Sequence, residues 1–327
     1  MTVETVREVQ AETQLWLWRT MLRIRRFEEN VEKLFMAGEI PGFVHLCIGQ
    51  EASAAGVCAN LNKDDYLTTT HRGHGHTLAK GAEMKRMLAE LYGRATGYCK
   101  GKGGSMHIAD FSVGMLGANG IVAGGFNLIC GAGMSIKLLK GQQVAVCMFG
   151  DGASNRGPFH ECLNWAAVYN LPTIFVCEHN GYASTAAATS FTSVANIVER
   201  APAYNMPAEL VDGNDALAVY QAMKRAVERA RTGGGPTLIE AKTYRIKGHY
   251  VGDPMLYRDK QELEAWLQRD AIVRLETQLR EQGLLDDTSK QQAQQAIEQE
   301  ISEAIEFARN SPFPSPDEVT DDLFAGE

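Results

Sequence analysis

Two polar residues follow two apolar runs that are typical of buried strands. Asp151 comes after the run 144–149, and Asn180 comes after the run 173–177. They are about one strand–helix–strand unit apart, and in such a unit both loops open on the same edge of a parallel sheet. A carboxylate, a side-chain amide and a free loop carbonyl are hard oxygen ligands that suit Mg²⁺, which completes its shell with phosphate oxygens. The spacing therefore predicts a magnesium and phosphate site at this edge.

The glycines on either side of Asp151 support the phosphate part of this prediction. Gly150 and Gly152 would let backbone N–H groups approach a phosphate closely. A Gly-Asp-Gly segment alone is equally compatible with a simple turn. An Asn at the end of the next strand favours the ligand site over that simpler interpretation.

A histidine-rich loop offers a different kind of chemistry. The segment HRGHGH places His71, His74 and His76 within six residues, and histidines at such short spacing can bind zinc together with a catalytic water. A zinc hydrolase is therefore an alternative hypothesis. It is the weaker one, because the loop has no carboxylate or Cys at ligand spacing and Arg72 among the ligands would repel a cation.

Other classes of protein find less support. Gly150-x-Gly152 is followed by Gly157 at the wrong offset for a GxGxxG dinucleotide motif, and there is no Walker A sequence. A catalytically inactive α/β partner protein stays open as a hypothesis. It requires Asp151 and Asn180 to have no function.

The elements that must position these residues follow from hydrophobic periodicity. A helical pattern over 11–37, ended by Gly38, predicts a long N-terminal helix. Its arginines Arg23, Arg25 and Arg26 are expected to face solvent or another subunit. Alternating strands and helices further along predict an α/β fold with a parallel sheet. The elements expected there are helices over 50–61, 159–169 and 216–231, strands over 66–70, 144–149, 173–177, 209–211 and 238–241, and a long glycine-rich irregular region over 97–125.

Composition limits the possible partners and compartment. The chain has 327 residues, of which 45% are hydrophobic, and a net charge of −8. It has no basic run, which argues against binding of nucleic acid. Its seven cysteines include no CxxC pair and read as reduced thiols of a cytoplasmic protein. Residues 1–14 are polar, and no apolar stretch reaches 18 residues, so neither a signal peptide nor a membrane span is expected.

Several longer segments, in order along the chain, resemble one known family. They are GFVHLCIGQEA (42–52), THRGHG (70–75), KGGSMH (102–107), NGIV (119–122), the Gly-Asp-Gly and Asn pair already described, and YRIKGH (244–249). Together they are similar to the α subunits of thiamine-diphosphate-dependent E1 enzymes, which belong to 2-oxo acid and acetoin dehydrogenase complexes. The resemblance runs from about residue 15 to residue 265.

The resemblance implies a role for each matching residue. Asp151, Asn180 and the carbonyl of Tyr182 would hold Mg²⁺. His249 would lie on a mobile loop near both the diphosphate and the reacting centre, and His45 would face the substrate carbonyl. The residues that would bind thiamine diphosphate are His71, Arg72, Gly120, Val122, Asp151, Gly152, Ala153, Asn180, Arg245 and His249. His71 stands where many relatives carry Tyr.

The resemblance also implies a domain plan: an N-terminal helical arm (1–40), a thiamine diphosphate- and Mg²⁺-binding α/β domain with helices on both faces of a parallel sheet (41–258), and a C-terminal helical tail (259–327). It implies partners as well. The Glu that activates the cofactor would come from an E1 β subunit in an α₂β₂ heterotetramer, and the acyl group would pass to a lipoylated E2.

The segments GMLGAN (114–119) and AYNMP (203–207) are most similar to bacterial acetoin dehydrogenases. The small-molecule substrate would then be acetoin, cleaved to acetaldehyde and an acetyl unit. Pyruvate and branched-chain 2-oxo acids are the alternatives.

Overall fold

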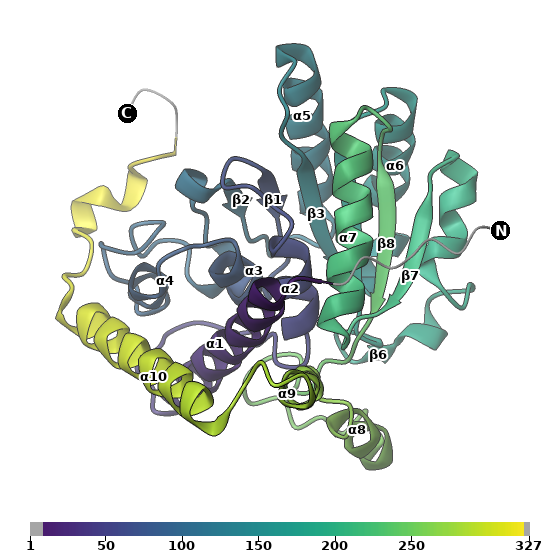
Figure 1. Cartoon of the computed structure of the whole chain (residues 1–327). Helices are drawn as coiled ribbons and strands as arrows, with labels where there is room; N and C mark the ends of the chain where they lie inside the picture. Colours follow the sequence, from purple (N-terminus) through teal and green to yellow (C-terminus); the bar gives the residue numbers. More distant parts are fainter. Residues whose placement is uncertain (1–8, 324–327) are drawn as a thin grey trace.

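The computed structural model describes residues 9–323. Its centre is a six-stranded sheet with the order β2-β1-β3-β4-β8-β7, and every neighbouring pair is parallel (Figure 1). The continuous apolar runs of the central strands fit a sheet that is covered on both faces. The strands are β1 Tyr66–Thr68, β2 Met115–Gly117, β3 Ala145–Gly150, β4 Thr173–His179, β7 Ala208–Asp212 and β8 Thr237–Lys242, and a separate small hairpin is formed by β5 Tyr182–Ala183 and β6 Ala186–Ala187.

Helices cover both faces of this sheet. Along β3, Val146 and Met148 enter the core shared with α1, α2 and α7, whereas Ala145, Cys147 and Phe149 enter the core shared with α5 and α6. This alternation is the period-2 geometry of a strand. The helices are α1 Ala11–Met36, α2 Glu51–Cys58, α3 His74–Ala79, α4 Met84–Leu91, α5 Gly124–Leu139, α6 Gly157–Val168, α7 Ala216–Arg231, α8 Lys260–Leu267, α9 Ala271–Glu281 and α10 Asp287–Asn310.

The predicted fold class is confirmed, and most predicted elements lie within a few residues of their observed positions. Helix α7 has the predicted bounds. The prediction missed α3, α4, α5 and β2. Between residues 9 and 323, none of the helices combines the length and the apolar character that a membrane crossing would require.

The arginines of α1 were expected to face solvent or another subunit, but all three pair with carboxylates of this chain. Arg25 pairs with Glu51 and, at 2.8 Å, with Asp270 before α9. Its neighbours Arg23 and Arg26 pair with acidic residues of α10. These ion pairs fold the C-terminal helices back against α1, as Figure 1 shows at the lower left.

The glycine-rich region 97–125 is mostly irregular, as predicted, although it includes β2 and the start of α5. One buried carboxylate organises its first part. Glu90 in α4 accepts hydrogen bonds from the backbone N–H groups of Cys99, Gly101, Gly103 and Gly104, at 2.7 to 2.9 Å. These bonds satisfy backbone donors that an irregular segment would otherwise leave unpaired.

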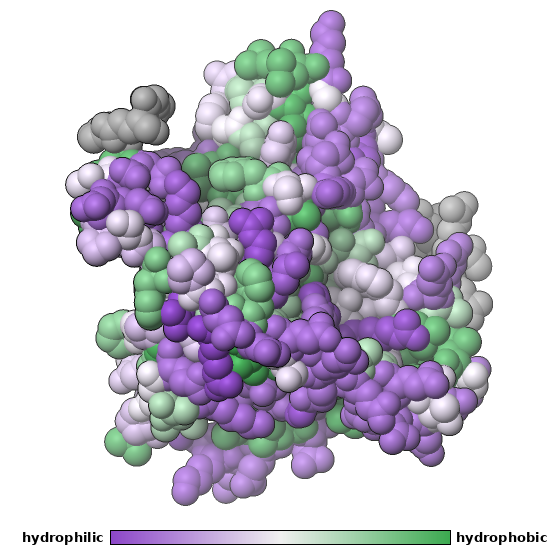
Figure 2. Space-filling view, turned by 90° about the vertical axis from the view of Figure 1, so that its left-hand side faces the viewer, coloured by the Kyte–Doolittle hydropathy of each residue, from purple (hydrophilic) through white to green (hydrophobic). Residues whose placement is uncertain are grey.

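The surface is not uniformly polar. The face that carries α4 and α10 is largely hydrophilic in Figure 2, with an apolar patch at the upper end of the molecule. Leu138 and Leu139, at the end of α5, are 73% and 79% exposed.

Candidate active site

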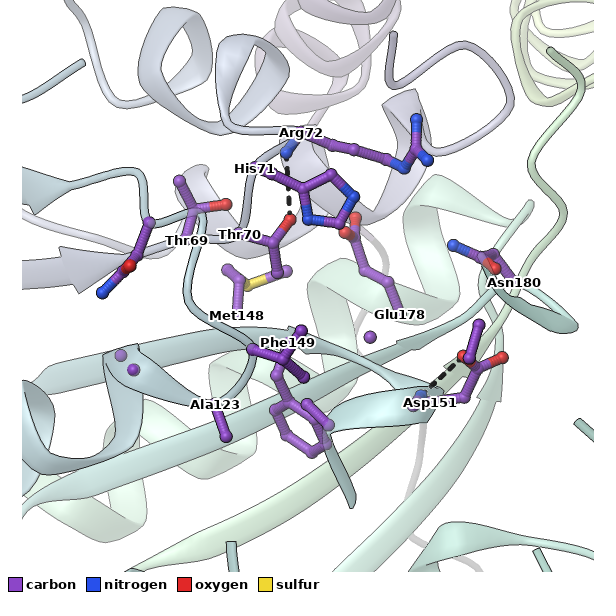
Figure 3. A pocket seen from close by; sticks show the side chains of 18 of the residues that line it. Thr69, Thr70, His71, Arg72, Ala123, Met148, Phe149, Asp151, Glu178 and Asn180 are labelled. Atoms are coloured by element: carbon purple, nitrogen blue, oxygen red, sulfur yellow. Dashed lines mark hydrogen bonds between the residues drawn. The ribbon is translucent and has the colours of Figure 1, made fainter. Parts of the chain in front are cut away.

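The strand-end residues meet as predicted. Gly150 at the end of β3 is in register with Glu178 of β4, which brings the two following loops together. One carboxylate oxygen of Asp151 accepts from the backbone N–H of Gly152 at 2.7 Å, and the other accepts from the N–H of Gly181 at 3.0 Å. Figure 3 shows the side chains of Asp151 and Asn180 next to one another at one end of a pocket.

The surroundings of Asp151 favour a bound cation. Its side chain is buried, and burial raises its pKa, although the nearby His179 and the hydrogen bonds from Gly152 and Gly181 oppose the shift. A cation in contact with the carboxylate would offset this desolvation. The oxygen of the Asn180 side chain and the buried residue Tyr182 lie in the same loop.

A cavity of about 300 Å³ extends from this corner. Two arginines line it. Arg72 follows β1 and Arg245 follows β8. Arg245 donates to the carbonyl of Ser184 at 2.7 Å and contacts the hydroxyl of Tyr257 at 2.8 Å. Its Nε is buried without a hydrogen-bond partner in the part of the chain that the structure describes.

The remaining cavity wall is mostly apolar and comes from β3, the start of α5, the segments that adjoin them and β5. It includes Val122 and Ala153. Gly120 lies at the exposed rim, outside the set of lining residues. The apolar part of the lining consists of Ile121, Val122, Ala123, Phe126, Met148, Phe149, Ala153 and Ala183.

The three predicted pocket histidines converge from separate segments. The ring centroids of His45 and His71 are 4.7 Å apart, those of His45 and His249 are 4.9 Å apart, and those of His71 and His249 are 5.5 Å apart. Burial lowers the pKa of His45 to about 4, with smaller contributions from Arg72 and Arg245. Burial, followed by the charge of Arg72, lowers the pKa of His249 to about 4. The pKa of His71 falls still further. All three rings are therefore neutral near pH 7.

Hydrogen bonds assign the ring protons of two of these histidines. Nη2 of Arg72 donates to Nδ1 of His249 at 3.0 Å, so the neutral ring of His249 carries its proton on Nε2. Nδ1 of His45 donates to the carbonyl of His249 at 2.6 Å, which leaves a lone pair on Nε2 of His45. The pocket thus holds one imidazole N–H donor and one imidazole acceptor.

The zinc hypothesis built on His71, His74 and His76 is wrong. Both ring nitrogens of His74 bond to protein groups, Glu28 at 3.0 Å and Ser105 at 2.9 Å. Those of His76 likewise bond to Thr69 and Glu178. Only His71 of the three lines the cavity.

Another histidine set, His45, His71 and His249, has ligand nitrogens within 4.8 Å of one another. The pocket also holds the guanidinium groups of Arg72 and Arg245, which oppose a cation at this position. The proton on Nε2 of His249 opposes it as well.

Some functional contacts were not predicted from the sequence. Asp253 accepts from the backbone N–H of His249 at 2.6 Å and from the hydroxyl of Tyr257 at 2.7 Å. Gln50 and Glu178 line the cavity and bond to each other. The one sequence signal for these residues was their position: they lie within or beside the segments that resemble the E1 α family.

The arrangement suits a ligand with anionic oxygens and an apolar ring. Two guanidinium groups provide donors for phosphate oxygens, and the buried Nε of Arg245 has no partner among residues 9–323. The Asp151 carboxylate and the Asn180 amide provide oxygen ligands for a hard cation at the same end. The apolar wall provides a surface for a ring.

Comparisons with known proteins agree with this geometry. Residues 19–317 match the family model described as "Dehydrogenase E1 component". The α subunit of the acetoin:2,6-dichlorophenolindophenol oxidoreductase of Bacillus subtilis is 50% identical over 96% of this chain and 94% of its own length. The protein of the same name from Cupriavidus necator is 43% identical over the same shares. The pyruvate dehydrogenase E1 α subunit of Porphyra purpurea is 41% identical over 95% of this chain and 92% of its own length.

Proposed function

The chain belongs to the dehydrogenase E1 component family, and from this premise we propose that it is the α subunit of a thiamine-diphosphate-dependent E1 enzyme that cleaves acetoin to acetaldehyde and an acetyl unit. The acetyl unit passes to the lipoyl group of an E2 partner. The observation that carries the proposal is the cavity that Asp151, Asn180, Arg72 and Arg245 line together.

The residues present fit the cofactor. Arg72 and Arg245 would bind the diphosphate, together with His71, His249 and the N–H groups of Gly152 and Ala153. Asp151, the side-chain oxygen of Asn180 and the carbonyl of Tyr182 would hold Mg²⁺. Backbone groups of Gly120 and Val122 would bind the aminopyrimidine ring. The buried carboxylate of Asp151 supports this assignment, as does the buried Nε of Arg245, which no described residue satisfies.

When bound, thiamine diphosphate supplies the carbon nucleophile and electron sink that breaks a C–C bond beside a carbonyl. The chain itself contributes orientation and proton transfer. His45 can accept a hydrogen bond or proton from a substrate hydroxyl at Nε2. His249 can donate a hydrogen bond from Nε2 to an oxygen or to the lipoyl sulfur. Both rings are neutral near pH 7, which suits hydrogen-bond donation by His249 and acceptance by His45.

The active site is completed by a β subunit in an α₂β₂ heterotetramer. Ile121 and Val122, at the mouth of the cavity, are 73% and 53% exposed. Apolar side chains in this position support a partner that covers the cavity and contributes the carboxylate that activates the cofactor.

Acetoin is preferred over other substrates because the 50% identical relative carries it in its name. Pyruvate is the alternative, since a 41% identical relative is a pyruvate dehydrogenase component. Branched-chain 2-oxo acids are a further alternative.

The proposed domain plan has three regions: a helical arm over 1–40, the cofactor-binding α/β domain over 41–258 and a helical tail over 259–327. All seven cysteines are free thiols, which supports a cytoplasmic enzyme.

The test is co-expression with the β subunit and a dye-reduction assay on acetoin, pyruvate and 2-oxoisovalerate. The α/β enzyme should reduce the dye with acetoin as the best substrate and only when thiamine diphosphate and Mg²⁺ are present. The purified α chain alone should be inactive. Turnover by α alone, or a preference for pyruvate, would contradict the proposal.

A further inference from the structure

A buried chain of hydrogen bonds connects Asn180 to residues outside the strand-end loops. Nδ2 of Asn180 donates to Oε1 of Gln50 at 3.1 Å, and Nε2 of Gln50 donates to Oε2 of Glu178 at 2.8 Å. The other carboxylate oxygen of Glu178 accepts from Oγ of Ser53 and, at 3.1 Å, from Nε2 of His76. All five side chains are buried. This hydrogen-bond network therefore connects α2, α3 and β4.

The Glu178 carboxylate sets the donor-to-acceptor direction of this hydrogen-bond network. A carboxylate only accepts hydrogen bonds, so Gln50 must turn its NH₂ group toward Glu178. In this orientation the side-chain oxygen of Gln50 points toward Asn180 and can only accept a hydrogen bond. Asn180 must therefore donate from its own NH₂ group. The oxygen of the Asn180 amide is then the end that remains available to a cation. It lies 3.1 Å from the backbone N–H of Tyr182.

The position of Gln50 is rigid. Its backbone N–H donates to the carbonyl of Cys47 at 2.9 Å. The preceding Gly49 has φ of +100°, and its carbonyl accepts from the hydroxyl of Thr243 at 2.7 Å. A fixed Gln50 can hold the Asn180 amide in one of its two orientations. The two have nearly the same shape but exchange the positions of the oxygen acceptor and the NH₂ donor.

We infer that Gln50 is a positioning residue for the metal site: it transmits the orientation imposed by the Glu178 carboxylate to the amide of Asn180. The inference rests on the proposed Mg²⁺ and thiamine diphosphate site. Without Gln50, the N–H of Tyr182 is the one remaining group among the described residues that orients the Asn180 amide, so its NH₂ group turns toward the cation more readily and metal affinity falls. Outer-shell partners of metal ligands typically change affinity by about 10–100-fold.

The test uses the assembled α/β protein and two variants. Gln50→Met removes both polar groups with little change in volume, and an unbranched Met adapts well to a buried site. Glu178→Gln keeps the shape but removes the acceptor-only group that orients Gln50. The matched control is Gln14→Met. Gln14 is also a buried glutamine, but it lies in α1 and donates to the carbonyl of Val9.

The measurement is the Mg²⁺ concentration at half-saturation of thiamine diphosphate binding, followed by tryptophan fluorescence at fixed cofactor. We expect this concentration to rise about 10–100-fold in Gln50→Met, to rise also in Glu178→Gln, and to stay at the wild-type value in Gln14→Met. Saturating Mg²⁺ should restore full cofactor binding in both network variants, which a general folding defect would not allow.

Two results would overturn the inference while leaving the proposed function intact. One is a wild-type Mg²⁺ titration in both network variants, and the other is an equal shift in Gln14→Met. A third result, wild-type protein that binds the cofactor without any divalent ion or does not bind it, would remove the proposed site and this inference together.

Discussion

One nitrogen of Arg72 contacts both the backbone and the ring of His249. Nη2 of Arg72 lies 2.7 Å from the carbonyl oxygen of His249 and 3.0 Å from Nδ1 of its ring. Nη1 of the same guanidinium donates to the carbonyl of Leu46 at 2.9 Å, next to His45. One arginine therefore fixes the backbone beside one pocket histidine and both the backbone and the ring of the other.

The first prediction concerns this arginine. Arg72→Lys keeps a positive charge but cannot form the planar set of three bonds. We expect cofactor affinity to fall by about 10–100-fold, because charge-assisted hydrogen bonds are each worth about 1.5–3 kcal/mol. We also expect faster proteolysis of the 249–258 loop. Calorimetric titration and a protease time course measure these effects, and the exposed Arg156→Lys is the control. Wild-type affinity in Arg72→Lys would contradict the account.

The second prediction concerns pH. The folded-state pKa of His45 and of His249 is about 4, whereas an unfolded histidine titrates near pH 6.5. Between these values the unfolded chain binds more protons, so stability is complete above pH 6.5 and is lost as pH falls toward 4. Each histidine should contribute on the order of 1 kcal/mol of this loss at pH 5, after allowance for partial exposure. Thermal midpoints of wild type and His45→Gln from pH 7.5 to 5 should therefore converge on acidification. Parallel curves would argue against a lowered pKa of His45 in the folded protein.

The third prediction concerns the segment after His249. The hydroxyl of Tyr257 contacts Nη2 of Arg245 at 2.8 Å and donates to Asp253 at 2.7 Å, and Asp253 also accepts from the backbone of His249. Tyr257→Phe should loosen this loop and raise hydrogen exchange at 249–257 by about tenfold, equal to the loss of about 1.4 kcal/mol from two bonds. Tyr250→Phe, which keeps the Arg245 and Asp253 contacts, is the control. Equal exchange in the two variants would show that the hydroxyl does not order the loop.

The fourth prediction concerns two glycines and separates the cost of a positive φ from the cost of steric overlap when alanine replaces glycine. Gly49 has φ of +100°, and a Cβ there would lie 2.1 Å from the carbonyl oxygen of Tyr244. Gly42 has φ of +81° but open space around it. Gly42→Ala should cost about 1 kcal/mol from backbone conformation alone, and Gly49→Ala should cost about 3 kcal/mol or more because backbone must also move. Denaturant unfolding measures the difference, and similar losses would contradict the packing described around Gln50.

The fifth prediction concerns the attachment of the C-terminal helices. Arg25 is largely buried and bonds to Glu51 and Asp270, whereas Arg26 forms a more exposed pair with Glu298. Removal of one partner from a buried pair leaves an uncompensated charge, which costs about 3–5 kcal/mol, whereas an exposed pair contributes about 0–1 kcal/mol. Arg25→Met should therefore lower the free energy of unfolding far more than Arg26→Met. Equal effects would mean that the Arg25 pair is not buried in solution.

The strand-end pairing was predictable because it depends on local patterns. Each apolar run identifies a strand, and parallel strands necessarily bring Asp151 and Asn180 to one edge of the sheet. The convergence of His45, His71 and His249 was predictable only through the family resemblance, since spacing alone does not place three distant segments together.

The rest depends on tertiary packing. Helix α5 was missed because its glycines lower helix propensity, and it is held by the burial of Phe126 and Ile129 against the sheet. The arginines of α1 were misread because their acidic partners lie on α2, before α9 and on α10, mostly far along the chain. The Gln50–Glu178 bond could not be predicted, because it requires the exact placement of α2 over β4.

The central claim is that Asp151 and Asn180 hold Mg²⁺ for thiamine diphosphate in this chain. The most direct measurement is calorimetric titration of the cofactor into the α/β protein, with and without Mg²⁺, for wild type, Asp151→Ala and Asn180→Ala. The account predicts Mg²⁺-dependent binding in wild type and a loss of at least about 100-fold in both variants, which should remain folded by circular dichroism. Wild-type affinity with unchanged Mg²⁺ dependence in both variants would contradict it.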